Sequence, residues 1–223
     1  MNLSALRLIV RVAVALACGA VLQAGAVRAQ SIDTREQALA ALTSADVTQR
    51  QRAIGWFAAS GNSSDADLLL DRLSDEDQRL RADAEGVVWM LWSRSGDPEV
   101  DTLLQGGIRD MNQGRMAQAV ETFTRVIERK PEFAEGWNKR ATAYYLMDDL
   151  DQSLKDCDEV IKRNPNHFGA LSGYGLIYIK RGELERALEY FERALAIDPN
   201  LKGVEESIEL IRYKMRKEGK EDT

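Results

Sequence analysis

Apolar residues recur along most of the chain at the three- and four-residue intervals of an amphipathic α-helix. In the second half these helical stretches come in pairs, which are separated by short turns at Gly114, at Asp148 and Asp149, and at Gly182. Two helices joined by a short turn pack as an antiparallel hairpin. The pattern therefore predicts an all-α protein built from helix hairpins.

The prolines mark where these hairpins end. Pro131, Pro165 and Pro199 lie 34 residues apart, and each follows the second helix of a pair. Proline cannot continue a helix and biases the preceding residue away from helical angles. Pro98 is different, because Asp97 before it can cap a helix and proline suits the first helical position. We expect the repeated region to begin there.

A frame of 34 residues divides this region into three copies, 100–133, 134–167 and 168–201. Small residues occupy the eighth and twentieth positions, which lets the two helices of a copy approach closely. Larger residues fill the space between them at positions such as the twenty-fourth. The eighth position holds Gly107, Ala141 and Gly175, the twentieth Ala119, Ser153 and Ala187, and the twenty-fourth Phe123, Cys157 and Phe191. Equal units with equal stops stack into a superhelix.

This pattern resembles the tetratricopeptide repeat (TPR), whose signature is W-x2-L-G-x2-Y, then A-x3-F, then P. The third copy matches best, through Tyr174, Gly175, Tyr178, Ala187, Phe191 and Pro199. The first copy departs at Asp110, and the second departs at Arg140, Ser153 and Cys157. The resemblance implies an α-solenoid of three TPR units over residues 98–201.

The resemblance also implies a concave groove that is lined by the first helix of each copy. Carried over position by position, the partner-binding residues are Leu104, Ile108, Met111, Asn138, Tyr145, Leu146, Leu176, Ile179 and Lys180. Some family members bind peptide C-termini through a clamp of lysine, arginine and asparagine. Leu104 and Ile108 stand at two clamp positions, so that clamp is absent here.

The groove residues suggest an apolar trough with polar edges. An exposed apolar surface of this kind marks a binding site, and it would suit an amphipathic helix or an extended apolar peptide. The alternative is that neighbouring helices of the same chain, including those of the first half, fill the trough.

Residues 30–97 lack the proline spacing but are also helical in pattern. Asp33 and Glu36 have the spacing of a capping box. A fainter similarity at an offset of 31 residues pairs Leu42 with Leu73, Asp46 with Asp77, Arg50 with Arg81 and Ala53 with Ala84. These stretches resemble HEAT repeats, in which a turn aspartate and a following arginine precede an apolar helix. We expect Trp56, Phe57, Trp89 and Trp92 to pack the core of this HEAT-like region.

A final helix is predicted over residues 201–217. One apolar stripe runs through Leu201, Val204, Ile208, Ile211 and Met215. Acidic residues lie early in this helix and basic residues late, which suits the helix dipole. The stripe should cover the end of the last copy, so residues 202–223 are predicted to form a capping helix and a disordered tail.

The first 29 residues have the order of a cleaved secretory signal, with Arg7 and Arg11, an apolar run over 12–22, and small residues before Ala29. We expect cleavage after Ala29, or after Ala26, and export to a bacterial periplasm without a membrane span in the mature form. The alternatives are an uncleaved membrane anchor and a lipid anchor on Cys18.

Charge and composition exclude some classes of function. Loss of residues 1–29 would remove three arginines and no acid, and the net charge would change from −6 to −9. A non-specific nucleic-acid binder needs a basic face, so we expect no nucleic-acid partner. Only Cys157 would remain, which excludes an intramolecular disulfide; we expect it to be a buried, inert thiol.

Catalytic groups are scarce outside the predicted signal. His167 is the one histidine and is expected to be a polar turn residue. The acidic runs at 74–78 and 148–151 lack the ligand spacing of a calcium loop. We therefore expect no catalytic site, metal or cofactor. The sequence predicts a non-catalytic adaptor that holds a protein or peptide partner in the groove. The alternative is a lipid-anchored or self-associating component of the cell envelope.

Overall fold

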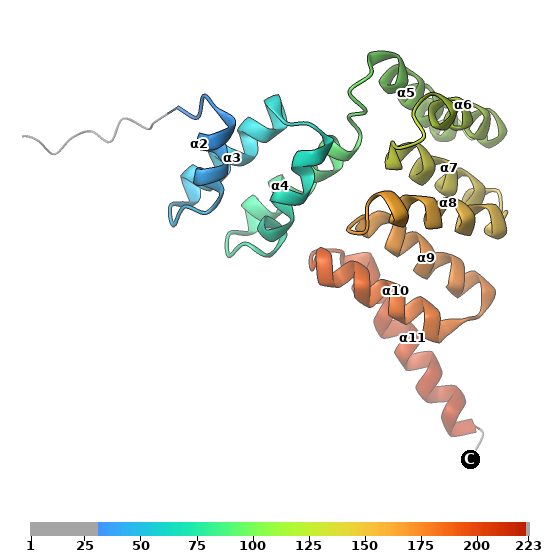
Figure 1. Ribbon diagram of the computed structural model, residues 1–223. Coiled ribbons are helices and arrows are strands. Elements are labelled where there is room, and N and C mark those ends of the chain that lie inside the picture. Colours follow the sequence, from blue (N-terminus) through green and yellow to red (C-terminus); the bar gives the residue numbers. More distant parts are fainter. Residues whose placement is uncertain (1–30, 222–223) are drawn as a thin grey trace, which may run out of the picture. The chain divides into compact units, whose positions relative to one another are not determined.

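The N-terminal half consists of two helix hairpins (Figure 1). The structure is a computed structural model that describes residues 31–221, so the predicted signal and Cys18 lie outside the described residues. The first hairpin is α2 (Arg35–Leu42) and α3 (Val47–Ser60), and the second is the 3-10 helix η1 (Ser63–Ser74) and α4 (Gln78–Trp92).

The two hairpins repeat one set of polar contacts. Asp46 caps α3 and Asp77 caps α4, and each carboxylate accepts a backbone N–H at 2.8 Å. Arg50 donates to the carbonyl oxygens of the two residues before Asp46, at 2.8 and 3.1 Å. Arg81 donates in the same way to the two residues before Asp77, at 2.8 and 3.4 Å. The similarity at an offset of 31 residues thus corresponds to equivalent contacts.

The start of α2 corrects one detail of the sequence analysis. The capping box uses Thr34 and Gln37, one residue later than the predicted pair Asp33 and Glu36. Both pairs have the required spacing, but Asp33 accepts a hydrogen bond from the Ser31 hydroxyl instead.

Each 34-residue copy contains one antiparallel helix pair. The pairs are α5 (Pro98–Asn112) with α6 (Met116–Arg129), α7 (Ala134–Leu146) with α8 (Leu150–Arg163), and α9 (Phe168–Arg181) with α10 (Leu184–Ile197). Helices α6, α8 and α10 each end two residues before a proline, and Asp97 caps α5 with Pro98 in its first turn. The predicted helix ends and the all-α solenoid are therefore confirmed.

The turns inside the three pairs share one backbone conformation. Gly114 and Gly182 have left-handed φ angles of 73° and 75°, and Asp148 has 64° at the equivalent position. Glycine adopts this conformation without strain, and aspartate is among the few other residues that tolerate it. The second copy therefore keeps the turn geometry without glycine.

The two helices of each pair approach most closely where the eighth position faces the twenty-fourth. A Cβ atom on Gly107 would lie 2.4 Å from the Phe123 ring, and one on Gly175 would lie 2.3 Å from the Phe191 ring. In the second copy Cys157 replaces the phenylalanine, and alanine stands at the eighth position. A smaller side chain on one helix thus accompanies a larger one on the other.

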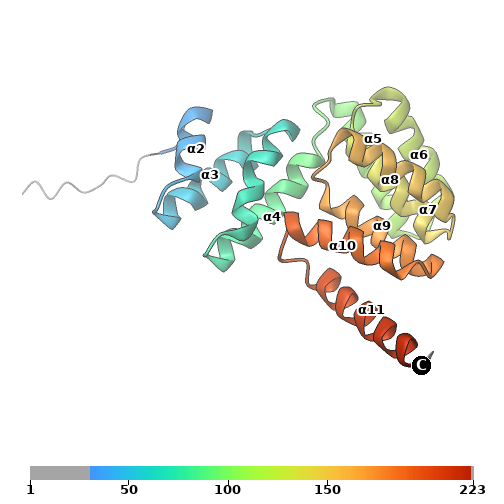
Figure 2. The same cartoon turned by 60° about the horizontal axis from the view of Figure 1, so that its bottom comes forward.

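The last helix, α11 (Lys202–Glu221), packs on α10 (Figures 1 and 2). Ile208 and Ile211 of its predicted apolar stripe are buried in the same cluster as Phe191. The stripe therefore covers the end of the third copy. No helix among residues 31–221 has both the length and the apolar character that a membrane span requires.

Aromatic rings join the N-terminal half to the boundary between the second and third copies. The ring of Trp92 stacks on His167, with centroids 4.4 Å apart, and the Trp89 ring packs edge-on against Phe168 at 5.0 Å. A Cβ atom on Gly169 would lie 2.3 Å from Trp89, so glycine permits this approach. The two tryptophans therefore pack between the halves, and not only in the core of the first half as predicted.

A second contact between the halves is polar. Arg81 Nε donates to Asn200 Oδ1 at 3.0 Å, and Asn200 Nδ2 donates to the Leu73 carbonyl oxygen at 2.7 Å. Asn200 lies between α10 and α11, so the N-terminal half touches both ends of the third copy. Residues 34–223 accordingly form one compact unit.

A buried ion pair lies under the stacked rings. His167 Nδ1 accepts the Ala170 backbone N–H at 3.1 Å, so its other ring nitrogen carries the proton and donates to Glu135, also at 3.1 Å. The Lys139 ammonium lies 2.9 Å from the same carboxylate. Burial opposes the charge of Glu135, but the histidine and the lysine outweigh burial and lower its pKa to about 2. His167 lies at the predicted turn, yet it is completely buried rather than a surface residue.

The glycine contacts generate a stability prediction. Gly175→Ala should lower the free energy of unfolding by about 1–3 kcal/mol, because its methyl group overlaps the Phe191 ring. Gly86→Ala in α4 is the matched control: a Cβ atom there meets nothing within 4 Å, and the variant should gain about 0.5–1 kcal/mol. Urea denaturation measures the free energy of unfolding of both variants.

The double variant Gly175→Ala with Phe191→Cys should lose less free energy of unfolding than the two single variants lose together. If the two losses simply add, the sizes of the two side chains are not coupled.

The ion pair generates a pH prediction. The pKa of Glu135 in the folded state lies below its ordinary value of 4.5, so its charge stabilises the fold above pH 4.5 and this contribution is lost as the pH falls toward 2. Glu135→Gln should therefore cost about 3 kcal/mol at neutral pH, and the difference from wild type should shrink in acid. Urea unfolding from pH 7 to pH 3 tests this. Exposed Glu132→Gln should show no such trend, and a constant difference for Glu135→Gln would refute the assignment.

Candidate functional site

Helix α5 contributes mainly to the core. Leu104 has no exposed surface and packs with Val100 and Phe123. Ile108 and Met111 are half-buried against the same cluster. Leu104, which was predicted to line the groove, is therefore a core residue and does not lie on an open surface.

The exposed predicted residues lie at the end of α7 and in the second half of α9. Leu176 is 40% exposed and Ile179 is 36% exposed, and Leu146 is more exposed than either. Tyr145 is half-buried beside them, and Met147 follows on the surface. We call these five residues the α7/α9 patch. Asn138, also predicted, is instead buried, and its amide donates to Glu135 at 2.9 Å.

Two adjoining hollows extend from this patch. One of about 140 Å³ lies between α7, α8 and α9, and the other of about 430 Å³ lies between α9 and α11. Both are bordered by Gly169, Ser172 and Leu176, and no charged side chain lines either of them. We call the two hollows together the groove. Trp89 forms one wall of the larger hollow but does not fill it.

The charged groups beside the groove are paired. Lys180 Nζ lies 2.8 Å from Asp148 and 4.3 Å from the centre of the Tyr145 ring. The bond with Asp148 raises the pKa of Lys180. Arg181 pairs with Asp151 in the first turn of α8. The groove therefore ends beside two cations that are already engaged by carboxylates.

Cys157 borders the smaller hollow. Burial raises the pKa of its thiol to about 12, so the thiol stays protonated at neutral pH. A protonated, buried thiol is a poor nucleophile. Its small side chain serves packing, next to Ala141.

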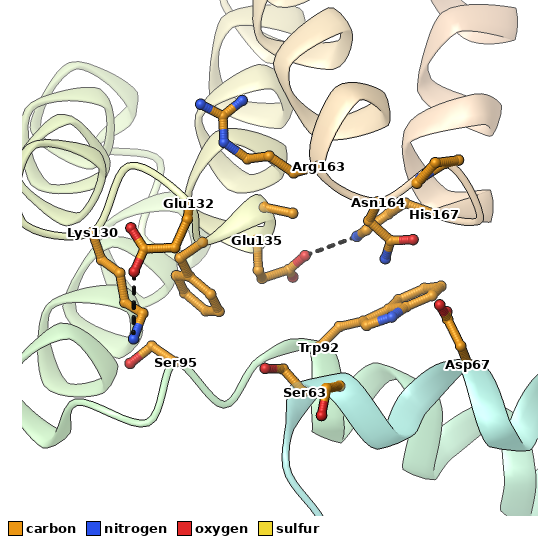
Figure 3. A pocket seen from close by; sticks show the side chains of 14 residues that line it. Ser63, Asp67, Trp92, Ser95, Lys130, Glu132, Glu135, Arg163, Asn164 and His167 are labelled. Atoms are coloured by element: carbon orange, nitrogen blue, oxygen red, sulfur yellow. Dashed lines mark hydrogen bonds and ion pairs between the residues drawn. The ribbon is translucent and has the colours of Figure 1, made fainter.

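A third pocket, of about 420 Å³, lies where the N-terminal half meets the repeats (Figure 3). Glu135 and His167 form one side, and Trp92, Ser63 and Asp67 form the other. The lining carries charges of both signs, but the buried groups are satisfied by each other. This pocket is therefore the edge of the junction between the halves.

His167 is not among the residues that line the groove. Both ring nitrogens of His167 are engaged, so the ring is not free to accept a proton from a substrate. Within residues 31–221, no group of three or more histidine, cysteine, aspartate or glutamate side chains is placed to hold a metal ion. The groove offers apolar surface and small floor residues.

Sequence reasoning missed Trp89 as a groove wall and His167 as a buried group. One signal was present in the 34-residue frame. The last position of the three copies holds Phe133, His167 and Leu201, so the histidine stands where the other copies place apolar side chains. The frame thus indicated burial, but not that Trp92 would cover the ring.

Comparisons with known proteins agree with this architecture. The tetratricopeptide repeat family model matches residues 104–158 and 138–201. A TPR repeat-containing protein of Rhizobium etli is 29% identical over 159 residues, which are 71% of this chain and 78% of that protein. Hsp70-Hsp90 organizing protein 1 of Glycine max is 27% identical over 120 residues, 52% of this chain. The chain spans only 21% of that longer relative.

A solved structure shows the same fold. The first TPR of Spaghetti (RPAP3), bound to the HSP90 peptide SRMEEVD, superposes with a TM-score of 0.51 at 22% identity, covering 52% of this chain and 93% of its own. The family match begins at residue 104, so the HEAT-like resemblance of the first half stays a prediction. Residues 104–201 of this chain thus match the tetratricopeptide repeat model, and they are stacked as an α-solenoid.

Proposed function

We propose that this chain is a non-catalytic interaction module that holds an apolar segment of a partner protein in the groove. The observation that carries this proposal is the uncharged lining of the two hollows, next to the exposed side chains of Leu176 and Ile179. Exposed apolar surface that is contiguous with a hollow is the usual mark of a binding site.

The chemistry of the groove selects the partner. The peptide bound to the Spaghetti TPR contains two glutamates and an aspartate, and binding such a peptide needs unpaired cations. Here Lys180 and Arg181 are paired with Asp148 and Asp151. An acidic peptide would therefore lose charged contacts in this groove, whereas aliphatic or aromatic side chains would not.

The shape of the groove favours a helix or an extended peptide that lies close to α9. Ser172 and Gly173 keep the floor low, so a partner backbone can approach α9 closely. Burial of one large apolar side chain contributes about 1.5–3 kcal/mol. Two or three such anchors in the groove would contribute about 3–9 kcal/mol before the cost of association is subtracted.

A photo-crosslinking amino acid at Ile179, in intact cells, tests this proposal. We expect one discrete cross-linked species, identified by mass spectrometry, which Leu176→Asp in the same chain reduces at least tenfold. The probe at Leu68 is the matched control, since that leucine is 39% exposed on η1, outside the groove lining. Cross-linking that Leu176→Asp leaves unchanged would place the binding surface elsewhere.

We also propose that the chain works in a bacterial periplasm after removal of its first 29 residues. The order of positive, apolar and small residues supports this proposal. The alternative is a lipid anchor on Cys18. Mass analysis of the protein from a cell envelope fraction should find Gln30 at the N-terminus. An acylated Cys18 would favour the anchored form, and an intact Met1 would contradict both.

A further inference from the structure

The distal part of α11 carries a second apolar face. Ile208 and Ile211 point into the cluster with α10, but Leu210 is 68% exposed and Tyr213 is 57% exposed. Between Leu210 and Lys217 the helix has four basic residues and no acidic one: Arg212, Lys214, Arg216 and Lys217. This part of α11 is therefore a short basic helix with two apolar side chains on its surface.

The α7/α9 patch is bordered by charges of the opposite sign to those of α11. Leu146, Met147 and Ile179 are exposed at the end of the groove. The loop beside them carries Asp148 and Asp149, and the first turn of α8 carries Asp151. Lys180 pairs with Asp148 and Arg181 pairs with Asp151, so two of the three carboxylates are neutralised. These five side chains together carry a net charge of −1. The patch thus joins apolar surface to an acidic edge.

We propose that the groove and the α7/α9 patch of one copy bind the distal part of α11 of a second copy. Leu210 and Tyr213 are spaced three residues apart, as anchors of a helix in a groove are, and they would pack against Leu176 and Ile179. The basic residues of the helix would lie beside the acidic loop. This inference rests on the proposed function, because it names the segment that the groove holds.

The lengths of the two surfaces agree. Residues 210–221 form about 18 Å of helix, and α9, with 14 residues, offers about 21 Å of groove floor. The same chain cannot supply this helix to its own groove. Its Gly203, Val204 and Ser207 already form a wall of the larger hollow, and its inner stripe is fixed on α10.

The experiment measures mass by light scattering against concentration, at low and high salt. Wild type should associate as concentration rises, and salt should weaken association because part of the attraction is between charges. The helix variant, Leu210→Asp with Tyr213→Asp, and the patch variant, Leu146→Asp with Ile179→Asp, should each lose association at least tenfold. All four residues are surface-exposed, and circular dichroism checks that both variants fold.

Mixing the two variants gives the decisive result. The patch variant retains α11 and the helix variant retains the groove, so the mixture should recover association that neither shows alone. Leu68→Asp with Met90→Asp, two exposed apolar residues of the N-terminal half, is the control and should associate like wild type. Failure of the mixture to associate, with both variants folded, overturns the proposal.

Two further outcomes separate this inference from the proposed function. If wild type keeps the mass of one chain at all concentrations while Ile179 still cross-links to a different protein, the inference fails and the function stands. Binding of wild type to anionic lipid vesicles through Leu210 and Tyr213, without association, likewise overturns the inference. If the Ile179 probe cross-links to nothing, both fail.

Discussion

The contact between the eighth and twenty-fourth positions of each repeat sets the geometry on which the rest of the structure depends. Gly107 and Gly175 each leave room for a phenylalanine ring on the second helix. The second copy instead has a larger residue, Ala141, at the eighth position and a smaller one, Cys157, at the twenty-fourth. Because protein interiors are close-packed, the combined volume of these two side chains sets the distance between the helices. Three pairs with similar spacing then stack in the same way, and they bring α7 and α9 side by side.

The buried group of Glu135, His167 and Lys139 joins this stack to the N-terminal half. Replacing a buried ion pair by apolar residues is often neutral for stability, so such a pair is weak evidence for stability alone. Here its position is informative, because the imidazole that Glu135 orients also stacks on Trp92. The oriented ring is thus one of the contacts of α4 with the repeats, and Trp89 of the same helix forms a wall of the groove.

Local rules explain what the sequence could predict. Residues close together in the chain determine where the helices end, where they turn and how they pair. The structure confirms the predicted helix ends before Pro131 and Pro165 and the predicted turns at Gly114 and Gly182. The family frame placed Leu104 in the groove, but its burial depends on neighbours that the frame does not describe. Contacts such as Arg81 with Asn200 join residues 119 positions apart, and nothing in either local sequence signals them.

The position of Asn200 has a consequence for how the molecule unfolds. In an open array of repeats each unit touches only its neighbours, so the ends can fray independently. Here Asn200, near the end of the third copy, is hydrogen-bonded to Leu73 and Arg81, in the half that precedes the first repeat. Unfolding of η1 and α4 would therefore also remove hydrogen bonds from the end of the third copy, so these two distant segments are coupled in unfolding.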